Sequence, residues 1–344
     1  MSGVELRRHT TIGLGGPARA WIEPDSSDAV IDAVCTEDPL LILGGGSNLV
    51  VADAGFDGTV VKLGARFANV EVQSTADHIQ VIAEAGASFD ALVARAVDEG
   101  FRGLEVLSGI PGSIGATPMQ NVGAYGREIA ELIEWVEVLD RDTREVQRLH
   151  QAECGFAYRH SRFRGHSRWI ILRVALSLTP SARSLPIRYA ELARALGIQP
   201  GESAPLARVR ETVMELRASK GMLVDANDPD SRSCGSFFTN PIVDAAQADE
   251  VERRVHAAQP MPRFAADAGK IKLAAAWLVE RAGYTKGYGD GAVGLSRKHT
   301  LALVNRGSAT TGELLAFART VRDGVRDKLG VTLEPEPIFV GCSL

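Results

Sequence analysis

The residues best suited to bind a ligand form an uncharged, glycine-rich run at 108–126, with the sequence SGIPGSIGATPMQNVGAYG. Glycine lets the backbone turn freely and come close to a ligand, so that main-chain N–H groups can bind it themselves. Binding without side-chain charge suits a large, flat, anionic cofactor. The alternative is a glycine-rich connector that binds nothing.

A second candidate site follows the apolar run Pro39–Leu43, which predicts a buried strand. The strand ends at Gly44-Gly45-Gly46-Ser47-Asn48, where successive N–H groups can converge on pyrophosphate oxygens without a lysine. No Gly-Lys-Ser/Thr follows, which excludes a P-loop. The stretch Gly13–Ala18 matches G-x-G-x-x-A, but no strand precedes it and Pro17 interrupts it, so we reject a dinucleotide motif there.

Four polar residues elsewhere could do chemistry. Ser236 lies in SRSCGSFFTNP, Arg159 in a poorly periodic segment with aromatic neighbours, and Glu336 in VTLEPEPIFV, while Lys220 ends a predicted helix. Taken alone, Ser236 is typical of a turn and Arg159 of a solvated or ion-paired side chain. Glu336 is typical of an edge strand, and Lys220 of a cation that compensates a helix dipole.

The elements that would position these residues are strands and helices in mixed order, which predicts an α+β fold. A linker is predicted after Pro180, and Ser26 is predicted to cap the first helix. Helices are predicted at 26–35, 88–99, 189–196, 205–219, 244–258, 272–282 and 310–329. Strands are predicted at 19–23, 39–43, 59–63, 70–73, 78–84, 133–139, 145–149, 169–178 and 301–305, with an extended segment at 331–340.

Length and composition narrow the class of protein. The 344 residues, 45% of them hydrophobic and 24% charged, suit a globular protein of two or three domains. A formal charge of −5 argues against a nucleic-acid partner and against an anionic membrane surface. The four scattered cysteines have no metal-site spacing, so we predict no metal and expect reduced thiols. We expect a cytoplasmic monomer with no membrane segment.

Five motifs in a fixed order resemble one enzyme family. LGGGSNL, SGIPGSIGATPMQNVGAYG, AYRHSRF, CGSFFTNP and LEPEP are similar to those of the UDP-N-acetylenolpyruvoylglucosamine reductases, also called UDP-N-acetylmuramate dehydrogenases. The resemblance runs from about Thr11 to Gly341, and IRYAEL looks like the tyrosine-bearing loop of the type I subclass. It implies a bound FAD that NADPH reduces. UDP-N-acetylglucosamine enolpyruvate then replaces NADPH in the same site, a step of peptidoglycan precursor synthesis.

The resemblance also implies an architecture. Three α+β domains are expected, of which two form an FAD-binding unit of the vanillyl-alcohol-oxidase type and the third binds substrate. Their expected bounds are 1–66 with 331–344, then 67–204, then 205–330. The last strand is expected to return to the FAD-binding part and to bring Glu336 to the flavin.

Site residues are implied position by position. Ser236 is the implied proton donor, and Arg159 and Glu336 are the implied partners of the substrate carboxylate and of the charge that develops on it. The implied substrate contacts are Tyr189, Lys220, Asn240 and Lys272. The implied FAD contacts are Gly44, Gly45, Gly46, Ser47, Asn48 and Leu49 for the pyrophosphate, with Gly109, Ile110, Pro111, Gly112, Ser113, Gly115, Ala116, Gln120, Asn121, Gly123, Ala124 and Tyr125 for the rest. The chain departs from the family pattern at Thr239, where many members have lysine, and at Ile338, where some have arginine.

Two other functions fit parts of the sequence. An FAD-dependent oxidase of small alcohols would share the flavin fold. Such oxidases often attach flavin through a histidine in the glycine-rich segment, and Gly44–Leu49 contains none. A sugar-nucleotide-binding module with a vestigial flavin site would purify without a cofactor.

Overall fold

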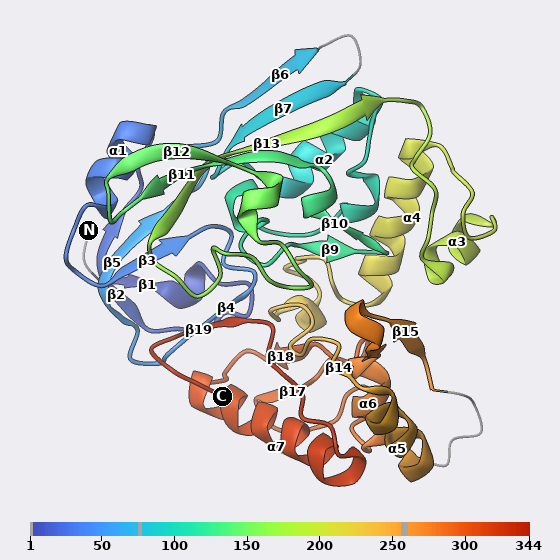
Figure 1. Ribbon diagram of the computed structural model, residues 1–344. Coiled ribbons are helices and arrows are strands. Elements are labelled where there is room, and N and C mark those ends of the chain that lie inside the picture. The colour runs from blue at the N-terminus through green and yellow to red at the C-terminus, as the bar shows by residue number, and fades with distance from the viewer. Residues whose placement is uncertain (1–2, 75–77, 256–260) are drawn as a thin grey trace. The chain divides into compact units, whose positions relative to one another are not determined.

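The structure is a computed structural model that describes residues 3–74, 78–255 and 261–344 (Figure 1). The chain divides into two compact units. Unit 1 comprises Met1–Val4, Ala18–Gly46 and Asp57–Leu223, and unit 2 comprises Glu5–Pro17, Ser47–Phe56 and Val224–Leu344. Each unit has a hydrophobic core of its own. Within the described ranges, no helix has both the length and the apolar character needed to span a membrane.

Unit 1 is organised around two sheets. The larger has the order β12-β11-β13-β7-β6, with β8 paired to β13, and all its described pairs are antiparallel. Its strands are β6 (Val70–Ser74), β7 (Ile79–Glu84), β8 (Phe101–Arg102), β11 (Ile133–Asp140), β12 (Glu145–His150) and β13 (Trp169–Pro180). The smaller has the order β1-β2-β5-β3, with strands β1 (Val4–Glu5), β2 (Pro17–Ile22), β3 (Leu40–Leu43) and β5 (Phe56–Lys62). A two-residue hairpin pairs β9 (Gly123–Ala124) with β10 (Arg127–Glu128).

Side-chain periodicity explains the larger sheet. In β7 every second residue, Ile79, Val81 and Ala83, is buried, as expected for a strand with one covered face. The central strand β13 is buried almost continuously from Ile170 to Leu178, which fits its position between two neighbours. This sheet therefore forms the main part of the unit 1 core.

Local capping sets where the unit 1 helices begin and end. Ser26 and Ser88 cap the starts of α1 (Ser27–Val34) and α2 (Phe89–Asp98). The hydroxyl of each serine accepts a hydrogen bond from the backbone N–H of the residue three positions later. Gly197, in the left-handed region, ends α3 (Ala190–Leu196). The fourth helix, α4 (Leu206–Ser219), ends at Lys220, and Figure 1 shows it in yellow beside α3.

Unit 2 combines three helices with short strands. Helix α7 (Thr311–Leu329), red in Figure 1, packs against α5 (Ala245–Val255) and α6 (Ala275–Arg281). A three-stranded sheet has the order β14-β16-β15, from Ile242–Val243, Ile271–Leu273 and Arg263–Ala265. Strands β17 (Val293–Leu295) and β18 (Leu303–Asn305) form a hairpin, and β4 (Leu49–Val51) pairs in parallel with β19 (Ile338–Val340).

The structure confirms the α+β class and most of the predicted elements, corrects the start of one helix, and shows how much of the last extended segment is a regular strand. The helix predicted at 272–282 begins only at Ala275, because Lys272 pairs with Ile242 and Phe264 in β16. The segment predicted as extended over 331–340 forms a strand only at 338–340, since Pro335 and Pro337 lack the N–H that a ladder needs. The last three residues of the helix predicted at 244–258 lie outside the described residues.

The capping box at the start of α7 gives a test of unit 2 stability. The Thr310 hydroxyl accepts from the Glu313 N–H at 3.1 Å, and the Glu313 carboxylate accepts from the Thr310 N–H at 2.8 Å. Thr310→Ala should lower the free energy of unfolding by about 1 kcal/mol, measured by urea unfolding followed by circular dichroism. Thr320→Ala, which removes an exposed hydroxyl from the middle of the same helix, is the control. Equal effects of both changes would contradict the capping role.

Candidate active site

The two glycine-rich segments meet inside unit 1. A Cβ on Gly44 would collide with the Ser113 hydroxyl, and a Cβ on Gly45 would collide with the Gly112 backbone. Gly46 follows with φ of +66°, a conformation that favours glycine. The absence of side chains therefore lets the loop after β3 lie directly on the run at 108–126.

A carboxylate fixes the start of this run. Asp90, in the first turn of α2, accepts a hydrogen bond from the Gly109 N–H at 2.6 Å and a forked pair from Arg210 of α4 at 2.6 and 3.0 Å. Burial raises the pKa of the Asp90 carboxyl, but the bonds from Arg210 and Gly109 outweigh it and leave this pKa below its ordinary value. The charged form therefore holds α2, α4 and Gly109 together at neutral pH.

The end of the run is held by its own polar groups. Buried Asn121 donates to the Glu128 carboxylate at 2.6 Å and to the Ala157 carbonyl at 3.1 Å, and it accepts from the Ala130 N–H at 3.1 Å. Its side-chain amide is thus committed to the shape of the run. The other predicted cofactor residues of the run differ in exposure. Gly109 and Ser113 are buried, Ala116 is exposed, and the rest are half-buried, namely Ile110, Pro111, Gly112, Gly115, Gln120, Gly123, Ala124 and Tyr125.

Arg159 lies at a tight turn beside this run. Ala157 and His160 pair across the turn, which puts Arg159 at φ of +52° in the left-handed region. Its guanidinium donates to the Gly123 carbonyl at 2.9 Å. The Ser161 hydroxyl then donates to the Met119 carbonyl at 2.7 Å, so the turn is attached to the run at two points.

Two predicted substrate residues, Tyr189 and Lys220, lie where the start of α3 meets the end of α4. The rings of Tyr189 and Tyr125 meet edge to face with centroids 5.6 Å apart. Lys220 forms an ion pair of 2.6 Å with Glu191, two residues after Tyr189. Burial raises the pKa of Tyr125 to about 12, so this phenol stays neutral and can donate a hydrogen bond.

Arg217 is a further charged residue of this cluster and was not among the site residues predicted from the sequence. Its side chain approaches Gly109, and one nitrogen donates to the Met222 carbonyl at 2.8 Å. Its Nε is buried and has no hydrogen-bond partner among the described residues. Burial lowers the pKa of the guanidinium. A signal was present, because Arg210 and Arg217 are seven residues apart and so lie on one face of α4.

In unit 2 the pairing of β4 with β19 brings two predicted site residues together. Leu49 lies opposite Ile338, so the residues just before each strand are neighbours. The Ile338 N–H donates to the Asn48 carbonyl at 3.0 Å, and the Asn48 amide donates to the Glu336 carbonyl at 3.4 Å. The half-buried Glu336 is therefore attached to the loop Ser47–Asn48.

The same network reaches Ser236. The next residue, Phe237, accepts from the Glu336 N–H at 2.9 Å and donates to the Leu301 carbonyl at 2.8 Å. Gly235 precedes Ser236 with φ of +73°. The Ser236 side chain is half-exposed, and its hydroxyl makes no hydrogen bond within the described residues. Ser236, Glu336 and Asn48 thus belong to one bonded framework.

The remaining predicted substrate residues are also in unit 2. The Asn240 side chain accepts from the Ala275 N–H at 2.9 Å, at the start of α6, and half-buried Lys272 lies in β16. At the two departures from the family pattern, the Thr239 N–H donates to the Glu334 carbonyl, and Ile338 pairs with Leu49 through its main chain.

The residues of unit 1 fit a flavin nucleotide. In the loop at 44–46, here called the glycine cradle, Gly44 and Gly45 have no room for a side chain, because a Cβ at either position would collide with Ser113 or Gly112, so they can offer a ligand only their backbone. Arg217 supplies buried positive charge with an unused donor. Lys62 donates to the Gly44 carbonyl, which adds a second cation near the cradle. Within the described residues, no group of three histidine, cysteine, aspartate or glutamate side chains could hold a metal ion.

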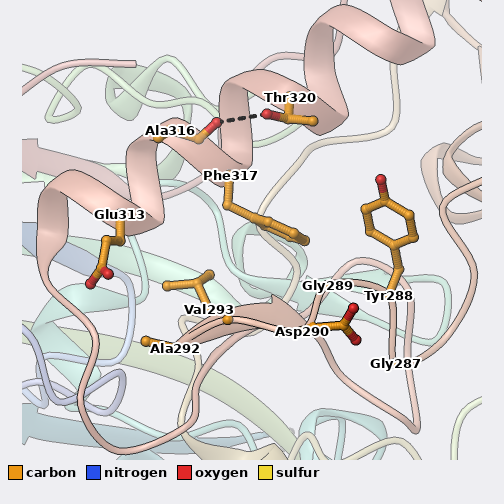
Figure 2. Close-up of a pocket in the computed structure, with 11 residues that line it drawn as sticks. Gly287, Tyr288, Gly289, Asp290, Ala292, Val293, Glu313, Ala316, Phe317 and Thr320 are labelled. Carbon is orange, nitrogen blue, oxygen red and sulfur yellow. Dashed lines mark hydrogen bonds between the residues drawn. The ribbon is translucent and has the colours of Figure 1, made fainter.

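A separate pocket of about 670 Å³ opens in unit 2 between α7 and the loop Gly287–Val293 (Figure 2). Tyr288 and Phe317 line it, and the carboxylates of Asp290 and Glu313 lie at its edge. It contains none of the predicted site residues.

The chain is similar to known proteins along almost its whole length. Residues 18–149 match the family described as "FAD binding domain", and residues 228–340 match "UDP-N-acetylenolpyruvoylglucosamine reductase, C-terminal domain". A UDP-N-acetylenolpyruvoylglucosamine reductase of Thermobifida fusca is 51% identical over 99% of this chain and 98% of its own, and that of Saccharopolyspora erythraea is 49% identical over 99% and 96%. The crystal structure of the reductase from Thermus caldophilus aligns with a TM-score of 0.68 at 26% identity, covering 98% of this chain and 97% of that one.

The contact of Gly45 with Gly112 gives a test of the cofactor cradle. Gly45→Ala should displace the loop and weaken FAD binding by roughly tenfold or more, because a loss of only ~1.4 kcal/mol in binding free energy lowers the affinity tenfold. The measurement is a fluorescence titration of the apoprotein with FAD. Gly64→Ala is the control, since its Cβ would contact only the flexible Lys62 side chain, at 3.5 Å. Equal FAD affinities in both variants would contradict the cradle.

Proposed function

The chain belongs to the UDP-N-acetylenolpyruvoylglucosamine reductase family and is an FAD-dependent oxidoreductase of peptidoglycan synthesis, and from this premise we propose that it reduces UDP-N-acetylglucosamine enolpyruvate to UDP-N-acetylmuramate with NADPH. The observation that carries the proposal is the unit 2 framework that bonds Asn48, Glu336 and the residue after Ser236 to one another. This framework holds three residues with predicted roles, Asn48, Glu336 and Ser236, in one hydrogen-bonded part of unit 2.

The reaction saturates the double bond of an enolpyruvyl ether. When bound, FAD would supply the hydride that the vinyl CH₂ carbon receives, with NADPH as the source of that hydride. Carbanion character then develops on the carbon that bears the carboxylate, and a proton must reach that carbon. We assign this proton to the Ser236 hydroxyl. A serine is a weak acid, but the developing enolate is a strong base, so a well-placed serine suffices.

Two further residues act on the developing charge. Arg159 is proposed to bind the substrate carboxylate, because a guanidinium is a fixed fork of donors that matches a carboxylate. Preorganised groups of this kind are usually the largest catalytic contribution, and losing one costs roughly a hundred- to a thousandfold in rate. Glu336, when protonated, donates one more hydrogen bond to the same charge.

We propose that separate groups of residues bind the substrate and the cofactor. Tyr189, Lys220, Asn240 and Lys272 are proposed to contact the uridine diphosphate. Gly44–Leu49 is proposed to hold the FAD pyrophosphate, and 109–125 the rest of the cofactor. We add Arg217 as a buried cation that compensates an anionic ligand, since its Nε lacks a partner in the described chain.

Other expectations from the sequence belong to the same proposal. They are the three-domain division with bounds at 66, 204 and 330, a cytoplasmic location, a monomeric state, and the absence of nucleic-acid partners. Membership of the reductase family argues against the two alternatives raised by the sequence, an oxidase and a non-catalytic binding module.

The proton-donor role separates the two half-reactions. Ser236→Ala should leave flavin reduction by NADPH near the wild-type rate and slow reoxidation by the sugar nucleotide by roughly a hundred- to ten-thousandfold, the range for proton transfer. Anaerobic stopped-flow absorbance measures both rates on one sample, so reduction serves as the internal control. Equal losses in both steps would refute the role of Ser236.

The role of Lys220 is tested by steady-state kinetics. Lys220→Ala should raise the KM for the sugar nucleotide by about tenfold or more, as expected for a lost charged hydrogen bond, and change kcat less. Arg208→Ala removes an exposed charge from the same helix and is the control. An unchanged KM would mean that Lys220 only compensates the dipole of α4.

A further inference from the structure

A hydrogen bond connects the start of the chain to the loop that carries Ser236. The Thr11 hydroxyl donates to the Ser233 carbonyl at 2.7 Å, across 222 positions of sequence. Both residues belong to unit 2. Thr10, by contrast, closes its own turn, because its hydroxyl donates to the Leu14 carbonyl at 2.9 Å. Two adjacent threonine hydroxyls therefore both donate to backbone carbonyls, Thr11 to a residue distant in sequence and Thr10 to a nearby one.

Ser233 controls the approach of the chain to Ser236. Its N–H donates to the Ser231 carbonyl at 2.8 Å, and its hydroxyl accepts from the Gly235 N–H at 3.2 Å. Gly235 then turns the chain through the left-handed region directly into Ser236. A shift of the Ser233 peptide is therefore passed to Ser236 through one side-chain bond and one constrained glycine.

A second link strengthens the connection at the neighbouring peptide. The Asn305 side chain donates to the Ile12 carbonyl at 3.0 Å, while the Asn305 N–H donates to the Arg232 carbonyl at 3.0 Å. Asn305, Ile12 and Ser233 are all buried. The Thr11–Ser233 bond is itself part-buried, so loss of the Thr11 donor leaves the Ser233 carbonyl incompletely compensated and costs free energy.

We propose that Thr11 is a positioning residue for Ser236, acting through Ser233 and Gly235. The inference rests on the proposed function, because it assumes that Ser236 donates the proton. Proton donation depends steeply on geometry, and a misplacement of about 1 Å costs roughly a hundredfold. Thr11 touches neither substrate nor cofactor in this account, so it acts only on the protonation step.

The test compares three variants of the FAD-loaded protein. Thr11→Val removes the donor at nearly constant shape, Thr11→Ser keeps it, and Thr10→Val removes the local bond next to it. Thr11→Val should slow reoxidation by UDP-N-acetylglucosamine enolpyruvate by about ten- to a hundredfold, with reduction by NADPH near the wild-type rate. Thr11→Ser and Thr10→Val should resemble the wild type in both steps.

Two further readouts distinguish positioning from loss of stability. In deuterium oxide, Thr11→Val should show a larger solvent isotope effect on reoxidation than the wild type, because protonation limits its rate. Hydrogen–deuterium exchange of peptides covering 233–237 should be faster in Thr11→Val, with or without substrate, and not in Thr11→Ser. If Thr11→Val does not fold, Thr11→Cys, with a weaker donor, should show a smaller change in the same direction.

The outcomes separate the two claims. Equal reoxidation rates in Thr11→Val and Thr10→Val would overturn the inference, as would equal losses in both half-reactions of Thr11→Val. A wild-type protein whose reduced flavin the sugar nucleotide does not reoxidise would overturn the proposed function and the inference with it.

Discussion

The parallel pairing of β4 with β19 is the constraint on which the chemistry proposed for unit 2 depends. Parallel strands begin at the same edge, so the loop before β4 and the segment before β19 must lie together. Asn48 and Glu336 occupy these two positions, 288 residues apart in sequence. The segment before β19 pairs through an isolated antiparallel bridge of Pro335 with Phe238, in which the Glu336 N–H donates to the Phe237 carbonyl. Pro335 and Pro337 lack the N–H groups that a longer ladder would need. One strand pairing thus connects the loop before β4, which is proposed to bind the cofactor, to the residues flanking Ser236.

In unit 1, segments distant in sequence are brought together by close backbone packing instead of by strand pairing. Its glycine-rich segments approach each other because side chains are absent at Gly44, Gly45 and Gly112. Helix α4 then bonds the run through Arg210 and Asp90, presents Arg217 beside Gly109, and ends at Lys220. A single helix therefore carries the structural residue Arg210 together with Arg217 and Lys220, which are proposed to compensate ligand charge and to bind substrate. This arrangement explains why charged residues occur on its half-buried side.

The fold was predictable where its determinants are local. The caps Ser26 and Ser88 and the alternation in β7 correctly located helices and strands, because they act within a few residues. The start of α6 was misplaced, since pairing of Lys272 with distant Ile242 overrides its local preference. The roles of Ser236, Arg159 and Glu336 came from resemblance and stay predictions. Arg217 and Thr11 were missed because their partners are distant in sequence or buried by tertiary packing.

The most direct test of the central claim is the visible spectrum of the purified protein, recorded anaerobically before and after two additions. For the proposed reductase we expect flavin absorption bands that bleach when NADPH is added and return when UDP-N-acetylglucosamine enolpyruvate follows. Bands that bleach but return only with oxygen would contradict the reductase and favour an oxidase. A colourless protein that FAD cannot reconstitute would contradict the flavin site itself.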